Sequence, residues 1–539
     1  MIASTQDGRT VVGAPLAAVA GVAAAVIGAG AGELVGALLA PASSPFAVVG
    51  AALIDAAPAW AKDTAIAWFG TSDKVALIVG IGIVLLLAAA AAGICQARWP
   101  RSGVIAFAVI GAGVGILALT RPEAGMLAWL PSVLAGVVAA IAVRMLVQRA
   151  PVHVQEDSPS AGRNAGVSTS ARADRPASVA HAPAPSRREF LVWAGGTAAV
   201  GVALALAGSV ARAGSTAVAS VRAAIRLPRA AKPAPAVPAG AALDVPGLAP
   251  LITPNDEVYR IDTALLVPSV DPADWKLRIH GMVAQEVTLT WDELRALPLT
   301  ETTVTLSCVS NPVGGDLVGN AVWLGYPIRE LLARAQPSGD ADMVLSTSVD
   351  GFTAGTPIEA LTDDRDALLA IGMNGEPLPL AHGFPVRMVV PGLYGYVSAT
   401  KWVTELEVTR FDKARAYWTD RGWSERGPIK LQSRIDVPRP GRDVEAGDSV
   451  IAGVAWQPRT GISGVEVQVD DGPWQKAELA AAISDDTWVQ WRMPWQAQPG
   501  QHQIRCRAIG RDATTQTDEY AAPAPNGASG WHTITTTVG

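Results

Sequence analysis

Five long stretches without a charged residue constrain this chain more than any other feature of its sequence. They cover residues 10–32, 75–97, 103–120, 124–143 and 190–211. A helix of about 20 apolar residues is long enough to cross the ~30 Å hydrocarbon core of a bilayer. Buried helices of a soluble protein are the alternative, but such helices seldom lack charge over this length. The sequence therefore predicts a helical transmembrane region over residues 1–150 and a last transmembrane helix at 190–211.

A sixth uncharged stretch, residues 34–54, differs from the others because it contains Pro41 and Pro45. Proline inside a helix removes a backbone hydrogen bond and clashes with the preceding turn. We therefore interpret this stretch as a re-entrant or extracellular segment, with a full membrane span as the alternative.

Arginine and lysine near the ends of the spans predict the orientation of the chain, because cytoplasmic loops are enriched in these residues. Arginines lie after the second and fourth spans and before the fifth, at Arg98, Arg101, Arg144, Arg149, Arg163, Arg172, Arg175, Arg187 and Arg188. We therefore expect the N-terminus inside, and the loop 55–74 and everything after residue 212 outside the cytoplasmic membrane. Basic residues that follow the fifth span oppose this topology, at Arg212, Arg222, Arg226, Arg229 and Lys232.

The segment before the last span combines a linker with a candidate export signal. Residues 151–189 are rich in Ser, Ala, Pro and Arg and lack apolar periodicity, which is typical of a disordered cytoplasmic linker. Residues 186–192, Ser-Arg-Arg-Glu-Phe-Leu-Val, resemble a twin-arginine signal directly before an apolar stretch. A chance arginine pair that obeys the positive-inside rule is the alternative. Twin-arginine export moves folded proteins, so it suits a domain that takes up a cofactor before crossing.

A Pro/Ala spacer at 213–242 leads to a region of mixed pattern over residues 244–425. Trp275 to His280 alternates like a strand, and Thr290 followed by two acidic residues is typical of a helix start. Further strands are expected at Glu301–Leu306, Met343–Val349, Val386–Val390 and Lys401–Thr409, and a helix at Tyr326–Ala335. Interrupted strands, short helices and many Gly/Pro turns predict an α+β domain.

The last region, residues 430–539, has an all-β pattern. Val465 to Val469 alternates strictly before a turn at Asp471-Gly472, and three later runs alternate in the same way. Turn residues separate the runs at short intervals, which predicts a sandwich of about 100 residues.

Several sequence blocks between 244 and 539 resemble the sulfite oxidase family of molybdopterin enzymes. They are residues 259–263 (Tyr-Arg-Ile-Asp-Thr), 307–311 (Ser-Cys-Val-Ser-Asn), 319–325, 373–378, 382–387, 390–392 and 401–402. Their number and order make the resemblance specific. Residues 469–474 and Gly530-Trp531-His532 resemble the immunoglobulin-like dimerisation domain of the same family. The resemblance thus implies a homodimer formed through residues 430–539.

The resemblance also implies a molybdenum–molybdopterin cofactor. Molybdenum on a pterin dithiolene needs a soft protein ligand, and a thiolate is such a ligand. By the resemblance Cys308 holds the metal; an inert thiol is the alternative. The other cysteines, Cys95 in a span and Cys506 in a strand, are interpreted as inert.

Further site residues follow from the same resemblance. His382, Arg387 and Lys401 match residues that bind the pterin phosphate, and Arg260 matches an arginine at the molybdenum end. Tyr259, Asp262 and Ser398 are additional cofactor-binding candidates. Trp423 aligns with the active-site tyrosine of the family and is a catalytic candidate together with Cys308 and Arg260.

Departures from the family pattern concern the substrate. Sulfite-oxidising members follow the cysteine with Ala-Gly-Asn-Arg-Arg, whereas Cys308 is followed by Val-Ser-Asn-Pro-Val, and residues 526–530 also lack the arginine expected there. A dianion such as sulfite needs several cations to replace its water. Only Arg260 remains of that cluster, so sulfite is not the expected substrate. If the protein oxidises sulfite efficiently, another cation such as Arg421 or Arg426 near Trp423 would have to line the pocket.

Electron transfer requires a separate carrier. No histidine lies inside a predicted span (the histidines are His153, His181, His280, His382, His502 and His532), so no b-type haem is predicted there. No Cys-x-x-Cys-His motif occurs, so no c-type haem is predicted either. A cytochrome, a quinone or a membrane redox protein is the expected partner, besides the lipid bilayer. The net charge of −6 disfavours nucleic acid as a partner.

The sequence therefore predicts a multi-domain, multi-pass protein of the cytoplasmic membrane. Its function is predicted as oxygen-atom transfer at a Cys-ligated molybdenum, with the catalytic domain on the extracellular or periplasmic side. One alternative is a reductase of S- or N-oxides, similar to methionine sulfoxide reductases. A second alternative, from another class, is a non-catalytic membrane-anchored adhesion or scaffold protein.

Overall fold

The structure is a computed structural model that describes residues 10–40, 43–58, 61, 64, 73–121, 124–154, 186–214 and 217–539. The chain divides into two compact units. The first comprises residues 1–53 and 75–215, and the second comprises residues 54–74 and 216–539. Most of the predicted linker at 151–189 lies outside the described residues.

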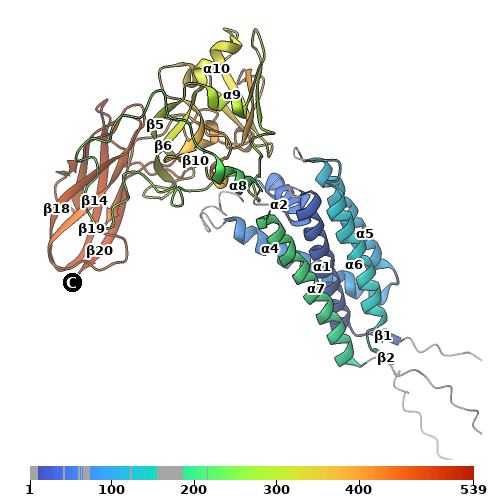
Figure 1. The fold of residues 1–539 in the computed structure, drawn as a ribbon. Coiled ribbons are helices and arrows are strands. Elements are labelled where there is room, and N and C mark those ends of the chain that lie inside the picture. The colour runs from blue at the N-terminus through green and yellow to red at the C-terminus, as the bar shows by residue number, and fades with distance from the viewer. Residues whose placement is uncertain are drawn as a thin grey trace, which may run out of the picture. The chain divides into compact units, whose positions relative to one another are not determined.

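The first unit is a helical bundle (Figure 1). Its long helices are α1 (Ala14–Leu39), α4 (Asp73–Arg98), α5 (Ser102–Leu119), α6 (Leu130–Gln148) and α7 (Arg187–Gly214). Within the described residues, these five helices are long and apolar enough to cross a membrane, judged by length and composition. The short strands β1 (Thr10–Val12) and β2 (Val152–Val154) pair antiparallel beside them.

Two of the helices are displaced along the sequence from the predicted spans. Helix α1 starts later than residue 10, with Pro15 in its first turn, and runs on past Glu33. The carboxylate of Glu33 is buried and accepts hydrogen bonds from Ser44 Oγ at 2.7 Å and from Phe46 N at 3.2 Å. Those partners explain how a charged residue fits inside the helix. Helix α6 likewise starts at Leu130, beside Pro131, instead of at residue 124.

The uncharged stretch 34–54 is divided between two helices. Its first part completes α1, and its second part belongs to α2 (Pro45–Ala56), which has 12 residues. This length is below the ~20 residues that a span requires, so α2 does not support the full-span alternative.

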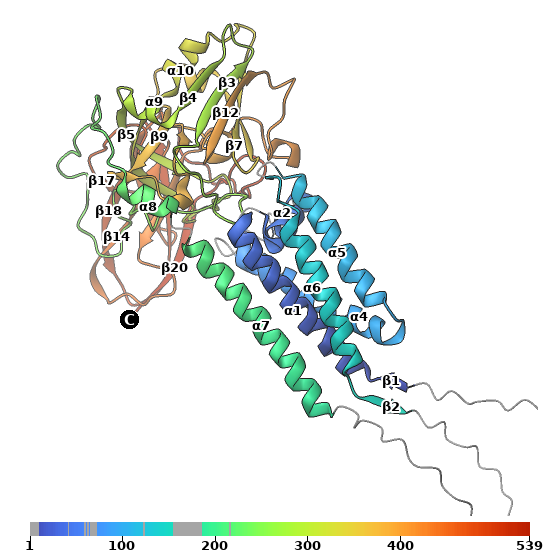
Figure 2. The same ribbon diagram turned by 45° about the vertical axis from the view of Figure 1, so that its right-hand side comes forward.

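Glycines let the helices of the bundle approach closely. A Cβ on Gly30 of α1 would lie 2.0 Å from the carbonyl oxygen of Gly201 in α7, and one on Gly111 of α5 would lie 2.7 Å from Cα of Gly136 in α6. Small residues at such crossings are typical of membrane bundles. Helices α1 and α7 run parallel and side by side (Figure 2). Ala20 in the first half of α1 packs near Phe190 in the first turn of α7, and Glu33 in the second half of α1 lies near Gly208 in the second half of α7.

The longer part of the second unit, residues 216–539, starts with a segment that the sequence predicts to be a spacer. Residues 217–224 form helix α8 (Ala217–Ala224), and Val218 is buried in the core. Arg222 donates to the carbonyl oxygens of Pro377 at 2.7 Å and Leu378 at 2.8 Å, and Lys232 forms a parallel bridge with Thr300. The prediction of a spacer is therefore wrong for this part, because apolar and basic side chains bind it to the domain.

Two five-stranded sheets form the α+β domain. The first has the order β10 (Glu376–Pro377), β9 (Leu368–Met373), β6 (Val318–Pro327) and β5 (Thr300–Ser307), with β11 (Arg387–Val389) also paired with β9. The second has the order β4 (Val287–Thr290), β3 (Lys276–Gly281), β12 (Val403–Thr409), β7 (Met343–Ser348) and β8 (Thr353–Pro357).

Three helices complete the α+β domain: α9 (Trp291–Ala296), α10 (Ile328–Ala335) and α11 (Glu359–Thr362). Helix α9 begins with the predicted cap, since Thr290 and Glu293 form a reciprocal capping box. The predicted helix at 326–335 starts two residues late, because Tyr326 and Pro327 end strand β6.

Two four-stranded sheets form the C-terminal sandwich. One has the order β13 (Gln432–Val437), β14 (Gly447–Trp456), β18 (Val489–Ala497) and β17 (Glu478–Leu479). The other has the order β16 (Gln475–Lys476), β15 (Ile462–Val469), β19 (Gly500–Gly510) and β20 (His532–Val538). Ile451, Val467 and Trp491 fill the space between the sheets and are fully buried.

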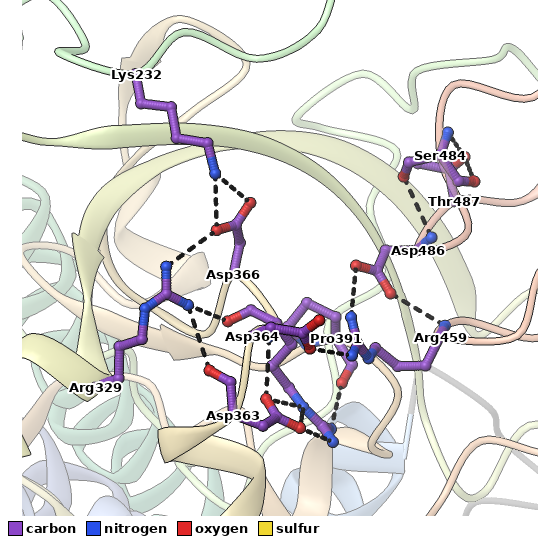
Figure 3. A network of polar contacts seen from close by, with 11 residues as sticks. Lys232, Arg329, Asp363, Asp364, Asp366, Pro391, Arg459, Ser484, Asp486 and Thr487 are labelled. Carbon is purple, nitrogen blue, oxygen red and sulfur yellow. Dashed lines mark hydrogen bonds and ion pairs between the residues drawn. The ribbon is translucent and has the colours of Figure 1, made fainter.

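A polar network joins the sandwich to the α+β domain (Figure 3). Arg459 pairs with Asp364 at 2.6 Å, and its backbone N–H donates to a carboxylate oxygen of Asp486 at 3.0 Å. The carbonyl oxygen of Asp486 in turn accepts from the backbone N–H of Thr305 in β5 at 2.9 Å. These contacts hold the sandwich beside the strand that leads to Cys308.

Candidate functional site

Cys308 begins the loop that joins β5 to β6. Its backbone N–H donates to Leu317 O at 2.9 Å, and its carbonyl oxygen accepts from Asn311 N at 3.1 Å. The side chain of Asn311 accepts from Leu317 N at 2.9 Å. The two ends of this nine-residue stretch, 309–317, are thus tied together beside Cys308, a half-buried residue.

The surroundings of Cys308 act on its pKa in both directions. Burial raises the pKa of the thiol, while hydrogen bonds from the backbone and the hydroxyl of Ser310 and the positive charge of Lys401 lower it. Hydrogen bonds to a thiolate and a nearby cation are what a metal-binding cysteine needs, because the thiolate is the ligand.

Asp262 lies between two of the predicted cofactor-binding cations. Lys401 Nζ is 2.7 Å from Asp262 Oδ2, and Arg260 Nε is 2.9 Å from the same oxygen. Lys401 also donates to Ala381 O at 3.1 Å. Burial outweighs the attraction of Asp262 and lowers the pKa of Lys401 to about 8.

Arg387 is the most buried cation of the site, with 5% of its surface exposed. Its guanidinium donates to three backbone carbonyls, those of His382 at 3.2 Å, Met388 at 3.3 Å and Ala399 at 3.4 Å. Within the described part of the chain, no carboxylate forms an ion pair with it. Desolvation lowers the pKa of Arg387 to about 10, which leaves it charged at neutral pH.

His382 lies in a short 3-10 turn, Leu380–His382, between the two buried cations. Its Nε2 is 3.2 Å from the carbonyl oxygen of Asn255. Burial and the charges of Arg387 and Lys401 lower the pKa of His382 to about 3. The ring is therefore neutral at physiological pH and is a hydrogen-bonding group here.

The charges of this cluster are suited to an anion. Arg260, Arg387 and Lys401 are matched by a single carboxylate, Asp262, among the contacts described here. The indole N–H of Trp323, whose ring lies 5.0 Å from the Arg387 guanidinium carbon, is buried without a hydrogen-bond partner. A buried excess of cations is costly unless an anion compensates it. A phosphate group, which accepts several hydrogen bonds, fits this donor set.

The described residues around Cys308 offer a candidate metal one thiol and few other ligands. Among the described residues, no group of three or more His, Cys, Asp or Glu side chains is arranged to hold a metal ion. One thiol beside a phosphate-binding cluster is consistent with a cofactor that brings its own sulfur ligands.

Two other predicted site residues, Tyr259 and Ser398, lie in different surroundings. Tyr259 is close enough to Cys308 and Arg387 for both charges to act on its pKa, which burial raises strongly. Ser398 is fully buried and donates to the carbonyl oxygens of Leu393 and Tyr394, so its proton is used within its own turn. Its described contacts therefore support a structural role.

Trp423 lies in an aromatic group. Its ring centroid is 5.8 Å from that of Tyr396 and 6.1 Å from that of Trp418, and it is nearly buried. The substitute cations near it are engaged elsewhere, because Arg426 pairs with Glu359 at 2.8 Å and Arg421 stacks over Tyr417 at 3.6 Å. None of the contacts described for Trp423 joins it to Cys308 or to the cation cluster.

The structure adds residues that the sequence analysis missed. Ser310 forms hydrogen bonds to Cys308 through its backbone N–H and its hydroxyl, and a hydroxyl two residues after a candidate ligand cysteine is a signal that the sequence does carry. Burial, with a smaller contribution from the nearby negative charge of the Cys308 thiolate, raises the pKa of Tyr394 to about 12. Its hydroxyl accepts from Lys430 N at 3.4 Å, and Lys430 Nζ is 3.0 Å from Asn526 Oδ1. These contacts join distant parts of the chain and leave no local sequence signal.

Known proteins share sequence with this region. Residues 264–418 match the family described as oxidoreductase molybdopterin binding domain. The mitochondrial sulfite oxidase of Mus musculus is 30% identical over 319 residues, which are 50% of this chain and 58% of that protein. The uncharacterized oxidoreductase YuiH of Bacillus subtilis is 31% identical over 157 residues, 29% of this chain and 76% of that protein. This chain thus spans little more than half of the mammalian relatives' length.

A solved structure also aligns with part of this chain. The crystal structure of the sulfane dehydrogenase SoxCD from Paracoccus pantotrophus covers 54% of this chain and 84% of its own, at 23% identity and a TM-score of 0.47.

Proposed function

We propose, from the premise that this chain belongs to the sulfite oxidase family of molybdopterin-dependent oxidoreductases, that it transfers an oxygen atom at a molybdenum held by Cys308 while its N-terminal helices anchor it in a membrane. Family membership makes the chain a molybdenum-dependent oxidoreductase, so the adhesion or scaffold alternative is abandoned. The observation that supports the finer proposal best is the cluster of Arg260, Arg387 and Lys401 around one carboxylate, beside a loop that carries a lone thiol.

In the proposed enzyme, each residue of the cluster has a separate task. Arg387 and Lys401 bind the phosphate of the pterin, and His382 donates or accepts one hydrogen bond as a neutral ring. Asp262 holds Arg260 and Lys401 in place. Ser310 donates to the sulfur of Cys308 and so stabilises the thiolate. The cofactor, when bound, supplies the oxygen-atom transfer and two-electron chemistry.

The substrate that suits this site best is a neutral oxide or another weakly charged molecule. The loop from Val309 to Val313 carries no charge, and Arg260 is already paired with Asp262 at 2.9 Å. Sulfite, the substrate named by the mammalian relatives, would need cations that this loop does not supply. A reductase of S- or N-oxides is therefore the second form of the proposal.

Molybdenum content and turnover together test the proposed activity. The full chain, purified from a host that makes the cofactor, is expected to contain about one molybdenum per chain and to turn over a sulfoxide or N-oxide with an artificial electron donor. Sulfite with an artificial acceptor is the parallel assay. Absence of molybdenum from such a preparation would contradict the proposal, and efficient sulfite oxidation would contradict its substrate part.

The location of the catalytic domain is tested separately. In our proposal residues 186–192 form a twin-arginine signal that places the domain outside the cytoplasmic membrane. Replacing Arg187 and Arg188 by lysine keeps the charge and therefore the positive-inside topology, but removes the feature that an arginine-reading receptor recognises. Protease should then cleave the catalytic domain in spheroplasts of the wild type only. Equal cleavage in both would mean that the arginines act through charge alone.

The remaining partners are also proposals. Electrons would be exchanged with a separate cytochrome, quinone or membrane redox protein, and the sandwich would join two copies of the chain. Size measurement in detergent, with and without residues 430–539, tests the dimer.

A further inference from the structure

We propose that the C-terminal sandwich positions the ligand loop of the enzyme: Arg434 of β13 and His532 of β20 hold residues 309–317, and this grip fixes the position of the Cys308 sulfur. Both are positioning residues, because they act through the loop. The inference deepens the proposed function and rests on ligation of molybdenum by Cys308.

Arg434 links the loop to a fixed point of the sandwich. Its Nη1 donates to Gly315 O at 2.9 Å, and its Nε donates to Asp436 Oδ1 at 2.6 Å. The other oxygen of Asp436 accepts from Ala249 N at 3.2 Å. The two side chains are only 12% and 11% exposed. The guanidinium of Arg434 is thus fixed by Asp436 through Nε, and its Nη1 binds the carbonyl oxygen of Gly315 in the loop.

His532 contacts the neighbouring residue of the same loop. Its Nδ1 accepts a hydrogen bond from Ile435 N at 2.9 Å, which fixes the ring. Gly314 lies directly against this ring: a Cβ on Gly314 would lie 2.1 Å from Cδ2 and 2.2 Å from Nε2 of the histidine. Any side chain at position 314 would therefore overlap the ring, and glycine is the residue that permits this approach.

Hydrogen bonds within residues 309–317 connect the contacts of Arg434 and His532 to Cys308. Gly315 N donates to Pro312 O at 2.9 Å, Asn311 Oδ1 accepts from Leu317 N at 2.9 Å, and Asn311 N donates to Cys308 O at 3.1 Å. Displacing residues 314 and 315 would strain each of these bonds in turn. Residues 309–317 form a loop between two strands, with Gly314 and Gly315 at its middle and Asp316 as its single charged residue, so the position of this part depends on the contacts that hold it from outside.

A matched pair of glycines tests the inference. Gly314 and Gly441 both have a φ of +75°, but a Cβ on Gly441 would meet nothing within 4 Å. Gly314→Ala and Gly441→Ala therefore impose the same backbone cost, and only the first pushes against His532. In the holoenzyme we expect Gly314→Ala to shift the absorption bands of the molybdenum–thiolate centre and to lower kcat, by about 100-fold for a misplacement near 1 Å, with little change in KM. Gly441→Ala should match the wild type in both measurements.

The same loop can be followed without the cofactor. In the cofactor-free full-length protein, Arg434→Met is expected to speed hydrogen exchange of the amides of residues 309–317 and alkylation of Cys308. Arg492→Met is its control, because Arg492 forms an exposed pair with Glu478 at 2.9 Å on another strand of the sandwich. This variant also decides the question if Gly314→Ala does not fold.

The outcomes separate this inference from the proposal beneath it. Wild-type absorption in Gly314→Ala together with wild-type exchange in Arg434→Met would overturn the grip. Cys308→Ser serves as the reference: wild-type metal absorption in that variant would overturn ligation by Cys308 itself. If Cys308→Ser changes the spectrum and the loop variants do not, only the role of the sandwich is wrong.

Discussion

The cation cluster around Asp262 and the loop after Cys308 are close neighbours with opposite character. The cluster holds three buried or half-buried cations, whereas the loop from Val309 to Val313 carries no charge. The first is built of charged side chains suited to an anion, and the second has backbone bonds of its own and contacts Arg434 and His532 of the sandwich. In our proposal, the positive charge of this site therefore binds the cofactor, and the loop offers none to the substrate.

The largest expected effect on turnover comes from replacing Cys308, the residue that precedes the loop and feels the charge of Lys401. Cys308→Ser should abolish turnover while the fold is kept, because the side chain has a similar size but a neutral hydroxyl is a poor ligand for a soft metal site. Turnover and molybdenum content are measured together on the purified chain. Retained turnover with molybdenum bound would show that another group holds the metal.

The cluster can be broken at its least compensated member. Arg387→Met should lower the affinity for the cofactor by about 10²- to 10⁴-fold, because two charge-assisted hydrogen bonds are worth roughly 3–6 kcal/mol. The cofactor-free variant should be at least as stable as the wild type, since an unpaired buried charge is removed. Molybdenum content and thermal unfolding check the two halves. A destabilised cofactor-free variant would mean that Arg387 serves the fold.

The neutral loop can be given the charge it lacks. Val313→Arg places an arginine where sulfite oxidisers have their second one, and one charge-assisted bond of ~1.5–3 kcal/mol should raise the specificity constant for sulfite by about 10- to 100-fold. The specificity constant for a neutral sulfoxide should change much less. The ratio of the two constants is the measurement. Efficient sulfite oxidation by the unmodified chain would refute the contrast between the regions.

The smallest expected effect is a dependence on pH. Burial lowers the pKa of Lys401 to about 8, below its ordinary value of 10.5, so the cofactor-free protein loses this charge as the pH rises through 8. Binding of the cofactor should therefore weaken between pH 7 and 9, by up to about tenfold. Lys401→Arg, which stays charged, should remove the dependence. A flat profile in the wild type would mean that Lys401 is not bonded to the phosphate.

Local patterns predicted the parts of the fold that depend on neighbours in sequence. The capping residues at Thr290 and the alternation at Val465–Val469 placed α9 and β15. Strands β6 and β9 were missed because nearly all of their residues are buried, so period-two alternation is absent. The segment 217–242 was misjudged because its partners, such as Pro377 and Thr300, are far away in the sequence.

In the candidate site, too, the sequence predicts single residues but not the contacts between distant segments. Resemblance of short blocks supplied Cys308, Asp262, His382, Arg387 and Lys401, and the structure brings the last four into one cluster. Among the described residues Arg387 bonds to backbone carbonyls and forms no ion pair, and His532 lies against Gly314; both are properties of packing between distant segments. No sequence window contains both partners of such a contact, so only the folded chain reveals it.

The parallel packing of α7 against α1 has a consequence for the order of assembly. Helix α7 follows the linker, yet Gly30 and Gly201 fit together as closely as any pair within the first four long helices. If residues 186–192 act as a twin-arginine signal, as we propose, α1 to α6 would enter the bilayer during synthesis, and α7 would join them only after its domain had folded and crossed. Until then the glycine face of α1 would lack its partner helix. Completion of the bundle would then record that a cofactor-loaded domain has arrived, and chains that never receive one would keep an unfinished helix bundle open to membrane proteases.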